Sequence, residues 1–186
     1  MPPLVSTNLL GMNIMALSMH EIAVPAFTQQ LTTLSDILDL TTAHAEARKL
    51  DPAMFLASRL SPDMFSLAQQ VRQATDHVQR CMAKLAGIDE LTFDKDEQTV
   101  DDLKARIAKT LDFVLSVPAD KLDGSEDKPI ELVTRVRTMN FPGRHYLLHF
   151  VFPQFFFHVT TAYDIARHAG VELGKRHYLG DIPQSK

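Results

Sequence analysis

Residues 147–170 read LLHFVFPQFFFHVTTAYDIARHAG, and this is the most apolar and aromatic stretch of the chain. Pro153 suits the first turn of a helix, and Gly170 suits the position just past a helix end. We therefore expect a helix over roughly 154–169, preceded by a shorter helical segment. Its first turn is apolar on nearly all sides, which predicts burial on most sides rather than along one stripe. Because this buried helix carries His158, it is where we expect a functional site.

The length and composition describe one ordinary globular domain. The chain has 186 residues, a formal charge of −4 and a pI near 6.0. Its basic residues are dispersed, so we expect no nucleic-acid partner. The one cysteine, Cys81, excludes an intramolecular disulfide and gives no metal-type cysteine pair. We expect no signal peptide, no membrane span and a cytoplasmic location.

The first long helix is predicted to start near Ser18, and residues 1–14 are interpreted as an N-terminal extension to a single domain over 15–186. Pro25 falls inside the helical pattern, where it either kinks the helix or marks its true start. Apolar positions alternate at spacings of three and four, as in a seam against a nearly parallel or antiparallel helix. These positions are Val24, Phe27, Leu31, Leu34, Leu38, Thr41 and Ala45.

A second long helix is expected to run from Ser61-Pro62-Asp63 to Ala86 and to stop at Gly87. Serine, proline and an acid in succession are typical of a helix start. Two long helices with matching seams indicate a helix bundle. The second seam consists of Leu67, Val71, Ala74, Val78, Cys81 and Leu85.

The region before the late stretch is more varied. Residues 88–98 are acidic and predict a loop, and Thr99 with Asp102 resembles a capping box that opens a third helix over 100–116. Residues 130–140 alternate apolar and polar side chains, which favours two short strands. After Gly170 we expect an extended tail on the surface. The predicted fold is all-α, with four helices near 18–47, 62–86, 100–116 and 144–169 and a small β-hairpin or loop insertion before the last.

Several side chains are candidates for chemistry. His158 is interpreted either as a core histidine bonded to a backbone carbonyl or to Asp76, or as a site residue. The simpler interpretation of Asp76 is an exposed carboxylate, and that of Cys81 is an inert core residue. His145 and His149 are four residues apart and would share a helix face, but two imidazoles without a third ligand are weak support for a metal site. Tyr163 could line a pocket or anchor the core.

The late stretch, with Gly170-Val-Glu-Leu-Gly-Lys175 after it, resembles an uncharacterised bacterial family with a domain of unknown function. The segments Ala43-His-Ala-Glu-Ala-Arg48-Lys and Ser61-Pro-Asp-Met-Phe65 resemble the same family. The likeness covers about residues 15–180, and the late motif is specific. This family is similar to a branch of the DinB/YfiT-like four-helix bundles, a superfamily described as metalloenzymes. The resemblance implies an up-down-down-up bundle that forms a homodimer.

The resemblance also implies where a metal site would lie. The superfamily holds a divalent metal with one histidine of the second helix and a His-x-x-x-His pair of the fourth. The pair corresponds to Gln154 and His158 here. The second-helix position falls near Gln73, with Gln70 and His77 within the uncertainty of the register. Only one of three ligands is clearly kept, and a neutral amide oxygen is a weak donor for zinc or nickel.

Three hypotheses follow. The first is a non-catalytic or small-ligand-binding bundle with a degenerate metal site and no cofactor, its pocket formed by His158, Gln154, Tyr163, Asp76 and Gln73. The second is a metal-dependent hydrolase or thiol transferase that uses His158 and Gln154 with Asp76 or His77. The third is a structural dimer without a site. Dimerisation is also suggested by apolar residues beyond the two seams, such as Phe55, Leu56 and Phe65.

Overall fold

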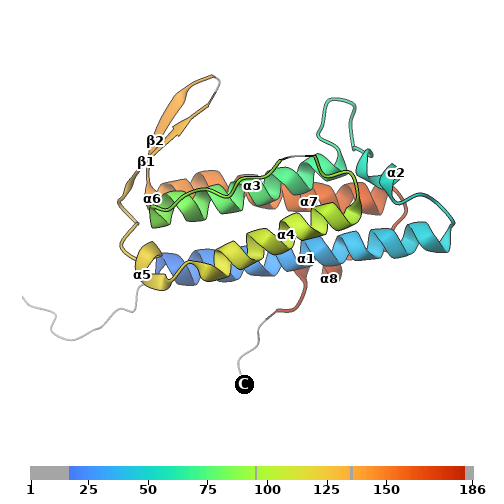
Figure 1. Cartoon of the computed structure of the whole chain (residues 1–186), viewed down its shortest axis with the longest axis horizontal. Coiled ribbons are helices and arrows are strands. Elements are labelled where there is room, and N and C mark those ends of the chain that lie inside the picture. Colours follow the sequence, from blue (N-terminus) through green and yellow to red (C-terminus); the bar gives the residue numbers. More distant parts are fainter. Residues whose placement is uncertain (1–16, 95, 135, 183–186) are drawn as a thin grey trace, which may run out of the picture.

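The computed structural model describes residues 17–94, 96–134 and 136–182 (Figure 1). The predicted extension over residues 1–14 lies outside them. In chain order the elements are α1 (Met19–Ala47), α2 (Ala53–Leu56), α3 (Leu67–Ala86), α4 (Val100–Ser116), α5 (Ala119–Leu122), β1 (Pro129–Val133), β2 (Thr138–Pro142), α6 (Gly143–His145), the π-helix η1 (Tyr146–Val151), α7 (Phe152–His168) and α8 (Lys175–Leu179).

Four long helices share one apolar core, as the sequence predicted. α1 and α7 run in one direction along the bundle, and α3 and α4 run in the other (Figure 1). The main helix contacts join α3 to α7, α1 to α4, α3 to α4 and α1 to α7. This is the up-down-down-up arrangement that the resemblance implied. The two predicted seams lie in the core, with Leu31, Val71 and Val78 among the residues with no exposed surface.

The start of α1 matches the expectation closely. The Ser18 side chain accepts from the Glu21 backbone N–H at 3.2 Å, and the Glu21 carboxylate accepts from the Ser18 N–H at 2.9 Å. This capping box satisfies two of the backbone donors that a helix start leaves without partners. Pro25 lies inside α1 and is exposed, so it does not mark the start of the helix.

The predicted start of the second helix is wrong by one and a half turns. α3 begins at Leu67, with Ser66 at the N-cap and Gln69 Oε1 accepting from the Ser66 N–H at 2.9 Å. The Ser61 hydroxyl instead donates to the Asp63 carboxylate within a tight turn. Ser61 therefore does not serve as the N-cap of the helix. The helix ends at Ala86 as predicted, and Gly87 adopts a φ of 69° just past the end.

The last helix of the bundle is not a uniform α-helix. It starts as α6, passes through the π-helix η1 and continues as α7, with Pro153 in the first turn of α7. The predicted shorter segment before Pro153 therefore exists, but it has π-helical hydrogen bonding. Such turns are rare in proteins and occur frequently near functional sites.

A long connection is required between α3 and α4, because these neighbours are parallel. Residues 88–94 and 96–99 run back along the bundle from the end of α3 to the start of α4 (Figure 1). α3 has 20 residues and spans ~30 Å, which an extended segment of this length can cover. In its described residues, the predicted acidic loop over 88–98 is thus a crossover that lies against the helices.

The hairpin before the last helix confirms a prediction, and the tail after Gly170 corrects one. β1 and β2 form an antiparallel hairpin that projects from the bundle before the last helix (Figure 1). The tail after Gly170 is not fully extended, since it contains α8. The side chain of Gln29 donates to the backbone oxygen of Leu179 at 2.7 Å, and that of Gln30 donates to Tyr178 O at 3.2 Å. These bonds hold α8 against α1.

Candidate functional site

The side chain of His158, a residue of α7, lies against the first turn of α3. Its hydrogen bonds show which ring nitrogen carries the hydrogen. Gln70 Nε2 donates to the backbone oxygen of Phe65 at 3.2 Å, so its Oε1 is the atom that lies 2.7 Å from His158 Nδ1. An amide oxygen only accepts, and His158 Nδ1 must therefore carry the hydrogen. In the neutral ring this leaves a lone pair on His158 Nε2.

Four aromatic rings form a column across the α3–α7 interface. Phe65 stacks on His158 with ring centroids 6.4 Å apart, and His158 stacks on His77 at 5.5 Å with an interplanar angle of 16°. The His77 ring meets Phe150, from the π-helix η1, edge-on at 6.2 Å. The π-helix thus supplies the last ring of the column. These contacts fix the orientation of both imidazoles.

Both histidines of the column are uncharged at neutral pH. Burial lowers the pKa of His158 to about 4. Burial also lowers the pKa of His77 to about 4, and the neighbouring His158 and Arg80 act in the same direction. A protonated ring here would lose hydration without gaining a counter-charge. The column therefore carries no charge at neutral pH, and His158 Nε2 is a hydrogen-bond acceptor within it.

A small cavity of about 170 Å³ lies beside the column, along one side of α3. Phe65 belongs to both the cavity wall and the column. The cavity is lined by Phe65, Gln69, Arg72, Gln73 and Asp76. Two of the side chains that the sequence indicated as pocket residues, Gln73 and Asp76, thus come together here. Because Phe65 also stacks on His158, its ring connects the cavity to His158.

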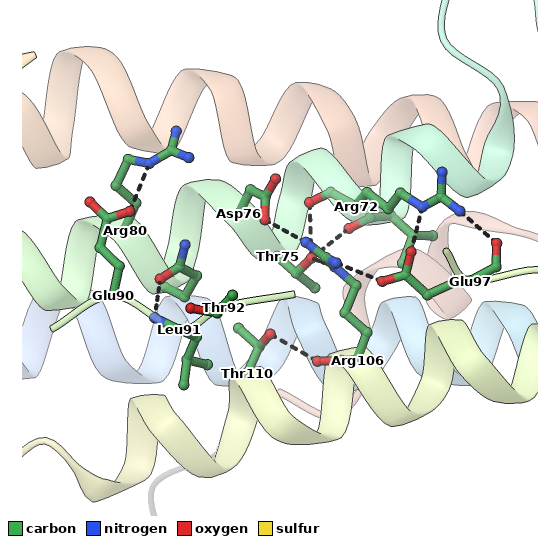
Figure 2. Close-up of polar contacts among 12 residues, drawn as sticks. Arg72, Thr75, Asp76, Arg80, Glu90, Leu91, Thr92, Glu97, Arg106 and Thr110 are labelled. Atoms are coloured by element: carbon green, nitrogen blue, oxygen red, sulfur yellow. Dashed lines mark hydrogen bonds and ion pairs between the residues drawn. The ribbon is translucent and has the colours of Figure 1, made fainter. Parts of the chain in front are cut away.

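Asp76 takes part in a buried ion-pair network centred on Arg106 of α4 (Figure 2). The Arg106 guanidinium also donates to Thr75 Oγ1 at 2.7 Å and to Glu97 Oε1 at 2.6 Å. Asp76 is only 7% exposed, so its interpretation as an exposed carboxylate is wrong. The physical reason is that α4 places a guanidinium opposite it, which compensates the cost of burying the carboxylate.

The same network fastens the crossover segment to the bundle. Glu97 of the crossover accepts from Arg106 and, through Oε2, from Arg72 Nε at 2.7 Å (Figure 2). Phe93, also in the crossover, covers the Arg106 guanidinium at 3.8 Å from the ring centroid. Arg106 is 3% exposed. One arginine thus joins α3, α4 and the connection between them.

Two further predicted pocket residues lie apart from the cavity wall. Gln154 is half-buried one turn before His158, on the same side of α7. Tyr163 is about 140° around α7 from His158. Its hydroxyl accepts from Arg167 NH1 at 2.7 Å, and its ring meets Tyr178 of the C-terminal segment at 6.0 Å. Tyr163 therefore anchors the segment that contains α8.

The remaining candidates also have defined positions. His145 and His149 are exposed and their rings are 5.4 Å apart. Among the described residues, no three histidine, cysteine, aspartate or glutamate side chains are arranged so that they could hold a metal ion. Cys81 is fully buried in the core. No helix within the described ranges is both long and apolar enough to cross a bilayer.

Sequence reasoning missed Phe65 as a site residue and Arg106 with Glu97 as a network. Arg106 follows Leu103 by three positions and precedes Thr110 by four, so it occupies the inward stripe of α4. A charged residue on the inward face of a helix indicates a buried ion pair, and this signal was available in the sequence. Its partners could not be identified from the sequence, because Asp76 and Glu97 come from two other segments.

The bundle and its helix directions define a DinB-like four-helix bundle protein. A crystal structure of a DinB family member from Shewanella denitrificans matches the chain with a TM-score of 0.82 and 32% sequence identity. The match covers 90% of this chain and 94% of that one. Residues 19–179 match the model of a domain of unknown function, DUF1993, and the chain belongs to this family. None of the curated proteins compared with the chain matches it.

Proposed function

We propose that this protein is a non-catalytic, small-ligand-binding member of the DinB-like bundles whose metal site is degenerate. The observation that carries the proposal is the side chain of Gln70. Its oxygen accepts a hydrogen bond from His158, and its nitrogen donates to the protein backbone. The resemblance implies a second-helix metal ligand near Gln73, with Gln70 within the uncertainty of the register. At this neighbouring position the Gln70 side chain serves protein structure.

The residues present do not fit a tightly held transition metal. His158 contributes one neutral imidazole, while Gln154 and Gln70 contribute amides. An amide oxygen is a weak donor to zinc or nickel, which prefer imidazole, thiolate and carboxylate ligands. Asp76, the carboxylate that the sequence offered as a ligand, is already paired with Arg106. Ligation by Asp76 would leave the Arg106 guanidinium buried with a weakened counter-charge.

The cavity beside the column supports ligand binding. It combines an aromatic side chain, Phe65, with polar groups of the kind that fix the orientation of a ligand. Phe65 is 46% exposed although its ring is held against His158. A partly exposed aromatic ring beside a cavity provides apolar area that a ligand can cover.

The alternative is a metal-dependent enzyme of the DinB/YfiT type, a hydrolase or a thiol transferase. One feature favours it: the hydrogen bond at Nδ1 leaves the Nε2 lone pair of His158 available, as in metal-ligating histidines. This reading needs two further donors that Gln154 and His77 would have to supply. The His77 ring lies nearly parallel to that of His158, at an interplanar angle of 16°.

Metal analysis distinguishes the ligand-binding bundle from the metal-dependent enzyme. The protein is untagged and is purified without a chelating column. We expect far less than one equivalent of zinc, nickel or iron per chain, with the same content in His158→Ala. A fragment screen by protein-observed NMR should perturb the signals of Phe65 and Gln73. Stoichiometric metal that is lost in His158→Ala would overturn the proposal in favour of the enzyme. A fragment set that leaves the cavity signals unchanged would refute ligand binding.

A further inference from the structure

Three glutamines of α3 lie around the cavity and the column, and they differ in whether their amides already have partners. Gln69 Oε1 accepts from the Ser66 N–H at 2.9 Å, where it caps α3. Gln70 uses both its oxygen and its nitrogen, on His158 and Phe65. The side chain of Gln73 makes no hydrogen bond within the described ranges, and it is half-buried in the cavity wall. One carboxamide is therefore available to a ligand.

The charged groups of the cavity wall are already neutralised within the protein. Arg72 Nε donates to Glu97 Oε2 at 2.7 Å, and Asp76 is paired with Arg106. The two imidazoles behind the wall are neutral for the reasons given above. An ionic ligand would have to compete with ion pairs in a partly desolvated place, which is unfavourable. The cavity therefore favours an uncharged ligand.

The size and the aromatic wall limit the shape of that ligand. A volume of about 170 Å³ is well below the ~300–1,000 Å³ of sites for drug-sized molecules. This volume is enough for a single ring. Phe65 offers an aromatic surface on which a planar ring gains more than a puckered one.

From these observations we propose that the cavity binds a small, neutral, planar ring with a lactam edge, and that Gln73 reads this edge. A primary carboxamide places a donor and an acceptor side by side in one plane. A lactam presents the complementary pair, an N–H beside a C=O. The two can therefore form a two-point hydrogen bond while the ring lies against Phe65. Pyridones and uracil-type bases belong to this class. The inference rests on the proposed function and names its ligand class.

Three single-ring probes separate the parts of this proposal. 2-Pyridone has the planar ring and the lactam N–H. N-Methyl-2-pyridone keeps the plane and loses the N–H donor. 2-Piperidone keeps the lactam and loses the aromatic plane. Binding is followed through the side-chain NH₂ signals of ¹⁵N-labelled protein, with the Gln73 signal identified by its absence in Gln73→Leu. Backbone signals of Phe65 report the aromatic wall.

We expect 2-pyridone to shift the Gln73 and Phe65 signals saturably, and each of the other two probes to bind about tenfold more weakly. Gln73→Leu should weaken 2-pyridone by a similar factor, because leucine keeps the bulk and removes the amide. Phe65→Leu should also weaken it. Gln98→Leu is the matched control, since Gln98 is exposed and its amide donates only to the backbone oxygen of Asp96. This control should bind 2-pyridone like the wild type.

Two results would overturn the inference. If N-methyl-2-pyridone binds as well as 2-pyridone and Gln73→Leu has no effect, the cavity binds planar rings without reading a lactam. In that case the proposed ligand-binding function stands. If none of the three probes shifts the cavity signals at up to about 20 mM, the lactam class is wrong. The proposed function is then decided by the fragment screen and the metal content, which do not depend on this ligand class.

Discussion

His158 Nδ1 lies 2.7 Å from Gln70 Oε1, and this single contact joins the middle of α7 to the first turn of α3. Because Gln70 also donates to the backbone oxygen of Phe65, the contact extends to the loop before α3. A buried donor and a buried acceptor are thus satisfied together, and each depends on the other. Removing one of them leaves its buried partner without a hydrogen bond, and this costs more free energy than removing both partners together.

His158→Phe should therefore lower the free energy of unfolding by about 1–3 kcal/mol, because it leaves Gln70 Oε1 buried without a donor. Gln70→Leu should have a comparable cost. The double variant should lose less than the sum of the two, since it removes both partners. Urea unfolding of the four proteins measures this coupling. Strictly additive changes would show that the hydrogen bond contributes nothing of its own.

Acid should destabilise the protein through its two buried histidines. The pKa of each is about 4 in the folded protein and near the ordinary histidine value of 6.5 when unfolded, so the unfolded state binds more protons between these values. The stability contributed by the neutral rings is complete above pH ~6.5 and is lost as the pH falls towards ~4, by about 1.4 kcal/mol per pH unit for each ring. Urea unfolding at a series of pH values measures this slope.

His77→Phe provides the control for this pH dependence. The substitution keeps an aromatic ring between His158 and Phe150 and removes one titrating group. We expect a shallower loss of stability between pH 6.5 and pH 4 than in the wild type. An unchanged slope in this variant would mean that His77 is not the source of the acid sensitivity.

Arg106→Ala should be strongly destabilising, by about 3–5 kcal/mol, because the buried Asp76 would lose the guanidinium opposite it. Glu97 would keep its pair with Arg72. Lys104→Ala removes a cation from the same helix, but its pair with Asp39 is exposed to solvent. That change should cost at most about 1 kcal/mol. Thermal or urea unfolding compares the two. Equal effects would contradict the central role of the Arg106 network.

Lys49→Gly should raise stability by about 1 kcal/mol. Lys49 has a φ of 56° just after the C-terminus of α1, and the N–H of Leu50 closes the end of the helix on Ala45 O at 2.9 Å. Glycine adopts this left-handed conformation without the steric cost that a side chain brings. Gly87→Ala, at a φ of 69° after α3, is the reciprocal change and should destabilise. A stabilised Gly87→Ala would contradict this account.

We propose that the protein is a homodimer, as its resemblance to DinB/YfiT-like bundles implies. The apolar residues that suggested an interface need correction, since Phe55 and Leu56 are each only 6% exposed and belong to the core of the monomer. Phe65 stays 46% exposed. Size-exclusion chromatography with light scattering at micromolar concentration should give twice the chain mass of 20.9 kDa. A mass of one chain would contradict the proposal.

The sequence by itself determined the bundle. Seams such as Leu67 to Leu85 alternate at spacings of three and four, which is the pattern of helices that pack against one another in a bundle. Local signals with a short-range cause were also predicted well, including the helix start near Ser18, the capping box of Thr99 with Asp102, the stop at Gly87 and the hairpin before the last helix. The start of α3 failed because two serines, Ser61 and Ser66, offered competing caps within one segment.

Only the tertiary structure decided the surroundings of His158. The sequence marked its helix as buried, but its partner Gln70 lies 88 positions earlier and was one of several glutamines and histidines within the register uncertainty. The burial of Asp76 depends on Arg106, 30 positions away on another helix. Such pairings arise from the relative position of helices along the bundle axis. A periodic pattern fixes which face of a helix is inward, but it leaves the shift along the axis open.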